Sequence, residues 1–419
     1  MEFYTNVFPY GNRMFVRGYS NGRPFQSKLD YYPTLYVPSK KADSPWRTLD
    51  GRIVDEVKPG MTKDAREFVK RYENVEGFDI YGNTNYVCQY ISDTYDYDIN
   101  WDVDQIRTFY LDIETATENG FPDIRSANEE VLLITIKDSK TKQVTTWGSR
   151  EFNNKRKDVN FILCRDEQHL LKEFMIYWQQ NYPDVITGWN TDFFDVPYLV
   201  KRIERELGES MASKISPWGI LNERKTFIKG TEEIHYDIQG ISQLDYLQLY
   251  KKFTYSKQES YRLDYIAEQE LGENKKVNPG NDFKDFYTNY WQDFVEYNIH
   301  DVELVEMLDD KMRLLELLYT MAYQAKINFE DVFSQVRMWD AIIYNHLRKK
   351  GIAIPTKTGG AKSEQFEGAY VKDPLIGQHK WVASFDLNSL YPHLIMQYNI
   401  SPETLTDEKI PCSVDKLLD

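Results

Sequence analysis

The chain has 419 residues, more than a single hydrophobic core usually contains, so we expect two or three domains. Hydrophobic residues make up 41% of it and aromatic residues 15%, which excludes an intrinsically disordered protein. The formal net charge of −15 excludes a protein that binds phosphate backbones over its whole surface. An acidic surface that keeps the protein soluble is the simplest explanation of this charge.

The cysteines and the hydropathy pattern indicate the cellular compartment in which we expect the protein. Cys88, Cys164 and Cys412 form neither a disulfide framework nor a zinc-binding pattern, which is typical of a reducing compartment. No stretch approaches the ~20 apolar residues that a membrane span requires, and the N-terminus lacks the pattern of a signal peptide. We therefore expect a cytoplasmic protein without a membrane partner.

Residues 1–105 predict a small α+β domain without obvious chemistry. Short β-type runs alternate with turn residues, and one amphipathic helix, Thr62–Tyr72, begins with Thr62 as its expected cap. The predicted strands are Phe3–Phe8, Met14–Tyr19, Thr34–Val37 and Tyr86–Ile91.

From residue 106 to about 325, strands are followed by longer helices, which predicts α/β organisation around a mixed sheet. A hairpin with a turn at 230–233 and no evident sheet partner interrupts this pattern. After the opening strand, the expected strands are Val131–Lys137, Gln143–Trp147, Phe161–Cys164 and Val185–Trp189, and the hairpin arms are Lys225–Lys229 and Ile234–Ile238. The expected helices are Glu167–Gln180, Val196–Leu207, Tyr261–Leu271 and Phe283–Tyr323, the last broken near Asn298.

The opening strand, Ile106–Thr117, is apolar until it reaches Asp112 and Glu114. Because side chains alternate across a strand, these two carboxylates share one face and Ile113 occupies the other. Two hard oxygen ligands on one face can hold a divalent cation. The same pattern also occurs in solvated turns, so this stretch alone leaves both interpretations open.

Two further acidic clusters follow. Asp195 lies where a strand gives way to a helix, and with Pro197 just inside that helix it can serve as a cap, a metal ligand or both. Tyr297 and Asp301 are four residues apart and therefore share a helix face. A phenol beside a carboxylate can position a water molecule, although this spacing is also common on helix surfaces.

The three clusters together resemble the exonuclease motifs of the DEDD superfamily, in the form with tyrosine that accompanies family B DNA polymerases. The resemblance implies a ribonuclease-H-like sheet and an active site of Asp112, Glu114, Asp195, Tyr297 and Asp301. It also implies two Mg²⁺ ions per active site, for which Mn²⁺ can substitute, held by the four carboxylates. The DNA-binding residues that we expect beside them are Lys275, Asn190, Phe194, Lys225 and Lys229.

A fourth motif lies further along. A long helical segment, Glu330–Lys350, and a Gly/Thr/Lys-containing loop, Pro355–Gly368, lead to a predicted strand and short helix at Trp381–Pro392. The string Asp-Leu-Asn-Ser-Leu-Tyr-Pro from Asp386 closely resembles motif A of family B polymerases. That resemblance implies that Asp386 and the Leu387 carbonyl bind catalytic metals and that Ser389, Leu390 and Tyr391 contact the incoming nucleotide.

Short strings at 32–35 and 90–95 are similar to family B polymerases of T4-like phages, so the resemblance covers nearly the whole chain. We expect an N-terminal domain of residues 1–105, onto which residues 340–375 pack back. We expect a 3′–5′ exonuclease domain at 106–339 and the start of a polymerase palm at 376–419.

The fingers helix and the turn with a second catalytic aspartate, which family B synthesis requires, are absent from this sequence. We therefore expect proofreading by this chain and polymerisation only with a second polypeptide that supplies the fingers, the rest of the palm and the thumb. Expected partners are DNA primer-template, single-stranded 3′ ends and, through that polypeptide, a sliding clamp and replisome proteins. The alternatives are a stand-alone exonuclease and a non-catalytic binding or scaffold subunit.

Overall fold

In a computed structural model, the chain forms two compact units, Met1–Thr358 and Gly359–Asp419. Among the described residues, no helix combines the length and apolar character that crossing a membrane would need. The residues described are 1–73, 75–118, 120, 122–228, 231–273, 276, 278–357 and 370–406.

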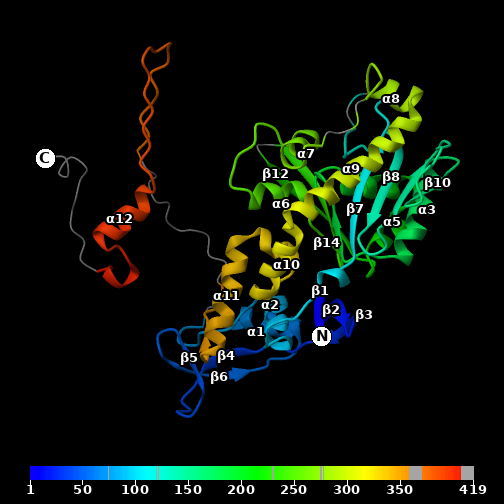
Figure 1. Cartoon of the computed structure of the whole chain (residues 1–419). Helices are drawn as coiled ribbons and strands as arrows, with labels where there is room; N and C mark the ends of the chain where they lie inside the picture. The colour runs from blue at the N-terminus through cyan, green and yellow to red at the C-terminus, as the bar shows by residue number, and fades with distance from the viewer. Residues whose placement is uncertain are drawn as a thin grey trace. The chain divides into compact units, whose positions relative to one another are not determined.

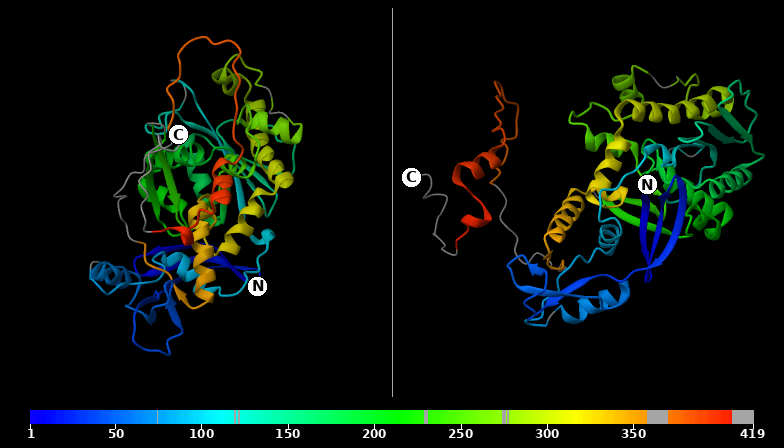
Figure 2. Two further views of the ribbon diagram at one scale, coloured as in Figure 1. Left: turned by 90° about the vertical axis from the view of Figure 1, so that its left-hand side faces the viewer. Right: turned by 60° about the horizontal axis from the view of Figure 1, so that its bottom comes forward.

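Two small sheets build the N-terminal segment (Figures 1 and 2). One is the antiparallel sheet β1-β2-β3, and the other has the order β15-β5-β6-β4, so the chain returns to this segment near residue 352. The strands are β1 (Glu2–Tyr10), β2 (Arg13–Ser20), β3 (Arg23–Asp30), β4 (Leu35–Pro38), β5 (Trp46–Thr48), β6 (Ile53–Val57) and β15 (Ile352–Ala353). The helices are α1 (Thr62–Tyr72), α2 (Tyr86–Thr94) and the short 3₁₀ helix η1 (Val103–Gln105).

Two local predictions in this segment are wrong. The run Tyr86–Ile91 is helical because Asn85 caps the backbone N–H of Cys88 at 3.2 Å and burial of the helix outweighs the strand propensity of its residues. Thr62 is the first helical residue and not the cap, since Met61 occupies that position. The Thr62 hydroxyl instead donates to the carbonyl of Gly11 at 2.9 Å.

The centre of the first unit is a six-stranded mixed sheet with the order β10-β9-β8-β7-β11-β14. β7, β8 and β9 pair antiparallel, whereas β10 runs parallel to β9, and β11 and β14 continue parallel to β7. This arrangement is the ribonuclease-H-like sheet that the sequence predicts. Its strands are β7 (Thr108–Thr115), β8 (Val131–Asp138), β9 (Val144–Gly148), β10 (Val159–Leu163), β11 (Val185–Thr187) and β14 (Ser242–Gln243).

Helices cover both faces of this sheet. Ile113 of β7 packs in one core cluster with residues of α3 (Glu167–Gln180) and α4 (Asp195–Leu207). Leu133 of β8 packs in another with residues of α8 (Phe283–Asn289) and α9 (Trp291–Met312). Asp112 and Glu114 therefore point away from α3 and α4, as the alternation predicts.

The remaining elements extend this body. β12 (Leu221–Ile228) and β13 (Thr231–Ile238) form a separate antiparallel two-stranded sheet, which confirms the hairpin. The predicted turn at 230–233 is wrong, because residues 231–233 belong to β13 and pair with residues 226–228. The predicted break near Asn298 is wrong: α9 continues through it to Met312, where Arg313 follows as the C-cap with a φ of 52°. The other helices are α5 (Glu209–Ala212), η2 (Ser213–Ile215), α6 (Tyr246–Phe253), α7 (Leu263–Leu271), α10 (Leu314–Ala325), η3 (Phe329–Phe333) and α11 (Gln335–Lys349).

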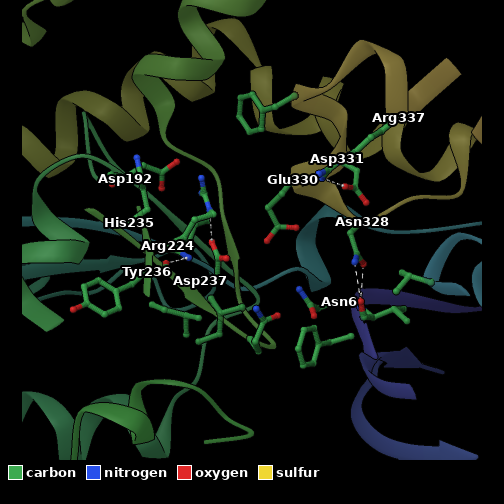
Figure 3. A pocket seen from close by; sticks show the side chains of 18 of the residues that line it. Asn6, Asp192, Arg224, His235, Tyr236, Asp237, Asn328, Glu330, Asp331 and Arg337 are labelled. Carbon is green, nitrogen blue, oxygen red and sulfur yellow. Dashed lines mark hydrogen bonds and ion pairs between the residues drawn. The ribbon is translucent and has the colours of Figure 1, made fainter. Parts of the chain in front are cut away.

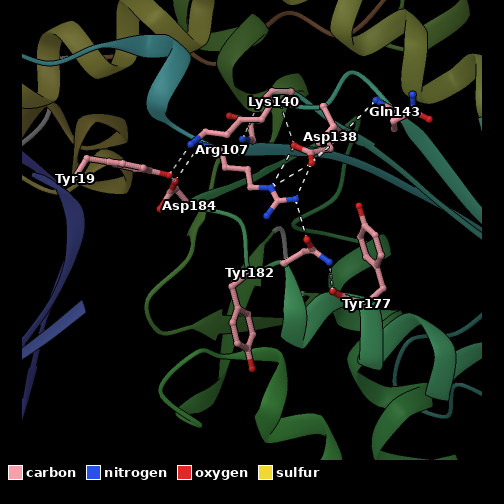
Figure 4. Close-up of polar contacts among 12 residues, drawn as sticks. Tyr19, Arg107, Asp138, Lys140, Gln143, Tyr177, Tyr182 and Asp184 are labelled. Carbon is pink, nitrogen blue, oxygen red and sulfur yellow. Dashed lines mark hydrogen bonds and ion pairs between the residues drawn. The ribbon is translucent and has the colours of Figure 1, made fainter. Parts of the chain in front are cut away.

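A buried polar network joins the β1-β2-β3 sheet to the central sheet (Figure 4). The Tyr19 hydroxyl donates to Asp184 Oδ2 at 2.7 Å, and the backbone N–H of Arg107 donates to the same oxygen at 2.9 Å. The guanidinium of Arg107 in turn donates to Asp138 Oδ2 at 2.7 Å. Because Asp138 and Asp184 are buried, these bonds fix the entry of β7 into the sheet.

The second unit contains α12 (Leu390–Tyr398) and the 3₁₀ helix η4 (Pro402–Thr404). The strand predicted from Trp381 is not formed, because no neighbouring strand is present among the described residues of this unit to complete its hydrogen bonds. Most of the predicted loop Pro355–Gly368 lies outside the described residues.

Candidate active site

Three of the predicted ligands meet on one face of the central sheet. Asp112 and Glu114 come from β7 and Asp301 from α9, and one carboxylate oxygen of each lies within 4.8 Å of the others. Asp301 is buried, with 4% of its surface exposed. Like charges brought this close are costly unless a cation or a proton compensates them, so the donor set fits a hard divalent cation.

Asn298, which sequence reasoning treated only as a helix break, joins the two elements that carry this cluster. Its Nδ2 donates to Asp112 Oδ2 at 2.6 Å, and its Oδ1 accepts a hydrogen bond from the Thr135 hydroxyl. Thr135 is the partner of Asp112 in the β7–β8 register, and Asn298 is fully buried. The amide therefore fixes the orientation of the Asp112 carboxylate. The position of Asn298 next to Tyr297, in a motif predicted to be helical, was the feature of the sequence that could have indicated this role.

Asp195 reaches the backbone of β7 from the first turn of α4. It is the first residue of α4, follows the N-cap Phe194, and accepts a hydrogen bond from the backbone N–H of Ile113 at 3.0 Å. The N-cap position of α4 therefore belongs to Phe194 and not to Asp195, whose side chain bonds to β7. Gly188 makes the close approach possible, since a Cβ there would lie 2.3 Å from the carbonyl oxygen of Leu111.

A second residue that sequence reasoning missed, Asp245, organises the segment before Asp195. Its carboxylate accepts the backbone N–H groups of Asn190 at 3.2 Å and Asp192 at 3.3 Å, and it caps α6 through Leu247 at 2.9 Å. Burial raises the pKa of Asp245 to about 6 although these N–H bonds oppose the shift. Burial and the nearby Asp245 carboxylate likewise raise the pKa of Asp192 well above its ordinary value.

Tyr297 lies one helical turn before Asp301 on α9. Its ring meets the ring of Phe286 nearly edge-on, with centroids 5.6 Å apart and planes at 84°. This contact with α8 holds the ring on the side of α9 that carries Asp301.

A cavity of about 540 Å³ lies between the turn before α4 and the β12–β13 hairpin. It is lined by Asn190 and Phe194, two of the predicted DNA-binding residues, and by Glu232 and Glu233 of the hairpin. Phe194 stacks on Tyr198 with centroids 5.5 Å apart.

Of the three predicted basic DNA-binding residues, Lys225 is the one that lies among the described residues. Lys225 lies on β12, where its Nζ forms an ion pair with Glu232 at 3.1 Å, so DNA would have to compete for it. Lys229 and Lys275 lie outside the described residues.

A larger cavity of about 1070 Å³ lies on the other side of the hairpin (Figure 3). Its wall includes Asn6 of β1, His235 of β13 and Glu330 of η3. Burial raises the pKa of Glu330 to about 7. Burial lowers the pKa of His235, whose ring nitrogens lie 3.0 Å from the Thr226 hydroxyl and 3.2 Å from the carbonyl of Asp192.

The predicted polymerase residues belong to the other unit. Asp386 and Leu387 precede α12, Ser389 occupies its N-cap position with φ 53°, and Leu390 and Tyr391 form its first turn. All five side chains are exposed.

The sequence comparisons agree with this geometry. Residues 72–266 match the exonuclease domain of DNA polymerase family B, and residues 326–416 match DNA polymerase family B itself. A mixed ribonuclease-H-like sheet with an acidic cluster defines a nuclease domain of this class. The chain belongs to DNA polymerase family B and carries its exonuclease domain and the start of its palm.

Several DNA polymerases are similar over most of the chain. Those of Escherichia phage RB69 and Enterobacteria phage T4, both described as DNA-directed DNA polymerases, are 35% and 34% identical over 96% of the chain. The DNA polymerase of Archaeoglobus fulgidus is 24% identical over 72% of the chain and 34% of its own length. The chain spans 47% of the length of each of the two phage polymerases.

Membership of this family and the match to its exonuclease domain support a metal-dependent enzyme. The acidic cluster of Asp112, Glu114 and Asp301 is the feature of the first unit that agrees with metal use.

Proposed function

We propose that this chain removes nucleotides from the 3′ ends of single-stranded DNA with two Mg²⁺ ions, or Mn²⁺ in their place. The observation that carries the proposal is the convergence of Asp112, Glu114 and Asp301 within 4.8 Å. These carboxylates would hold two metal ions, and the bound ions would supply an activated water and stabilise the departing 3′ oxygen of the phosphodiester.

The side chains have separate tasks in this proposal. Asp112, Glu114 and Asp301 hold the cations together with Asp195, whose hydrogen bond to the Ile113 backbone ties it to the strand that supplies the first two ligands. Tyr297 orients the attacking water from the next helical turn. Asn190 and Phe194 contact the terminal nucleotides from the 540 Å³ cavity.

The test replaces Asp112 and Glu114 together with alanine. The double variant should keep the fold and lose cutting of a single-stranded oligonucleotide, and Mn²⁺ should no longer raise its melting temperature. A control that replaces Asp43 and Glu56, two exposed acids of the N-terminal segment, should behave like the wild type. Wild-type cutting by the first double variant would refute the proposal.

We further propose that polymerisation requires a second polypeptide with the fingers, the rest of the palm and the thumb. The second polypeptide, and not this chain, would contact a sliding clamp and replisome proteins. The match of residues 326–416 to the polymerase family, with Asp386 inside it, supports this proposal over a stand-alone exonuclease. A single aspartate does not hold two metals in polymerising geometry, so the partner must bring another beside Asp386.

A further inference from the structure

The connection between α6 and α7, together with the two lysines at the end of α6, is basic in an otherwise acidic chain. We call residues 251–262 the α6–α7 loop. The chain as a whole has a net charge of −15, whereas this stretch has four basic side chains and one acidic side chain, Glu259. The basic residues are Lys251, Lys252, Lys257 and Arg262.

Aromatic side chains are interleaved with these charges. Tyr255 is fully exposed at the tip, and the described part of the chain provides no hydrogen bond, ion pair or ring contact for it. The ammonium group of Lys251 lies 5.0 Å from the centroid of the Tyr261 ring. An exposed ring next to cations offers one surface for a nucleobase and another for phosphates, which is the combination that single-stranded nucleic acids bind.

The base of the loop is held by the segment that leads to the candidate active site. The indole N–H of Trp189 donates to the carbonyl of Tyr261 at 3.1 Å. Trp189 immediately precedes Asn190, which lines the 540 Å³ cavity.

Gln258 adds two further bonds that brace the loop. Its backbone N–H lies 3.4 Å from the Tyr261 hydroxyl, and its Nε2 donates to the Tyr250 hydroxyl at 3.1 Å. The loop is therefore positioned relative to the nuclease segment, while the ring of Tyr255 stays available.

We propose that the α6–α7 loop binds single-stranded DNA upstream of the 3′ end that is being removed, with a base stacked on Tyr255 and phosphates on Lys257 and Arg262. This inference rests on the proposed exonuclease function and adds a subsite to it. Only strands long enough to extend beyond the acidic cluster would use this subsite, so its contribution should depend on strand length.

The test measures binding of labelled oligothymidylates of about four and about sixteen nucleotides to the full chain in EDTA. Tyr255→Ala should weaken binding of the longer strand by about tenfold and leave the shorter one unchanged. Lys257→Gln should reduce the slope of log affinity against log salt by about 0.7, the expected value for one lost phosphate contact with a single strand. In Mg²⁺, both variants should cut the shorter strand at the wild-type rate.

Tyr32→Ala and Lys58→Gln are matched controls, because both side chains are exposed on the N-terminal segment. If Tyr255→Ala and Lys257→Gln bind the longer strand as these controls do, the inference is wrong. Failure of the wild-type chain to cut either strand in Mg²⁺ would contradict the nuclease proposal instead, since the binding measurements are made without metal.

Discussion

Asn298 Nδ2 donates a hydrogen bond to Asp112 Oδ2 at 2.6 Å and thereby couples α9 to β7 at the candidate active site. Both elements supply cluster carboxylates, so this bond sets how the two halves of the cluster face each other. Asn298 is in turn held by the Thr135 hydroxyl on the neighbouring strand. It acts on the cluster through Asp112 and is a positioning residue.

Replacing Asn298 with alanine should therefore lower exonuclease activity by about 10- to 100-fold, the usual cost of losing a side chain that orients a metal ligand. It should also cost about 1–3 kcal/mol of unfolding free energy, because the buried Thr135 hydroxyl and the Asp112 carboxylate both lose a partner. Mg²⁺ titrations of activity provide the specific measurement: saturation should need a higher concentration, and excess metal should restore part of the rate. A stability loss with an unchanged Mg²⁺ requirement would show that Asn298 is only structural.

Tyr297 and Asp301 allow a comparison on one helix face. Tyr297→Phe deletes a hydroxyl and keeps the edge-on contact with Phe286, so we expect an unchanged melting temperature and about a tenfold slower reaction. Asp301→Asn removes a charge from the cluster and should slow the reaction by at least ~100-fold. Single-turnover rates on the same oligonucleotide measure both. If both variants lost the same factor in single-turnover rate, the Tyr297 hydroxyl would have to do more than orient water.

The strand alternation of Asp112 and Glu114 was predictable because a buried strand end fixes which side chains share a face. The positions of Asp195 and Asn298 were not fully predictable. An aspartate at a helix start is ordinarily a cap, and only the tertiary approach of α4 to β7 shows that its oxygen accepts the Ile113 N–H instead. Asn298 resembles a helix breaker by propensity, yet two buried hydrogen bonds hold it inside a continuous helix.

The error at Tyr86–Ile91 has a similar physical origin. A run of aromatic and β-branched residues favours a strand locally, but this segment buries Tyr86, Tyr90 and Ile91 in a helix capped by Asn85. The return of the chain to the N-terminal segment through β15 depends on pairing with β5, about 300 residues earlier, and composition carries no signal for such a contact.

The β12–β13 hairpin gives a prediction about duplex substrates. Residues 229 and 230 between its strands lie outside the described residues, and β12 and β13 form a sheet of two strands. Its base packs in the core through Ile234, Tyr236 and Ile238, whereas Phe227 near its far end is 74% exposed, which favours contact between that end and a ligand. Deleting residues 230–233 should slow cutting at duplex ends much more than cutting of single strands, because the hairpin helps to hold template and primer apart. Paired assays on the two substrates measure this, and an equal loss on both would contradict the role.

Glu330 gives a prediction about pH. Burial raises its pKa in the folded chain from 4.5 to about 7, so the folded state holds this proton more tightly than the unfolded state. Its stabilising contribution is therefore fully present below pH ~4.5 and is lost as the pH rises through ~7, a difference of about 3 kcal/mol.

Glu330→Gln removes this titration. The difference in unfolding free energy between pH 5 and pH 8 should shrink relative to the wild type, as measured by urea denaturation at constant salt. Glu56→Gln, at an exposed position, is the control and should leave the difference unchanged. An identical pH dependence in the wild type and Glu330→Gln would show that Glu330 does not titrate in this range.

Asp386 gives the last prediction, which concerns the second polypeptide. Among the described residues 370–406 none is buried, and large apolar side chains are exposed, including Trp381 at 100% and Phe385 at 94%. Exposed apolar surface of this kind marks an interaction site, and a stable obligate interface would bury ~2,000 Å² or more.

We expect that mixing this chain with a fragment that contains the fingers, the remaining palm and the thumb gives primer extension that neither polypeptide shows alone. Asp386→Ala should abolish extension by the mixture and leave exonuclease activity unchanged, because its carboxylate belongs to a different unit from the cluster of Asp112, Glu114 and Asp301. Trp381→Ser should weaken association of the two polypeptides, whereas Tyr32→Ala, at an exposed aromatic residue of the N-terminal segment, should not. Size-exclusion chromatography and primer extension on the same mixtures measure both effects. Extension by the purified chain alone, or a mixture indifferent to Asp386, would refute the requirement for a partner.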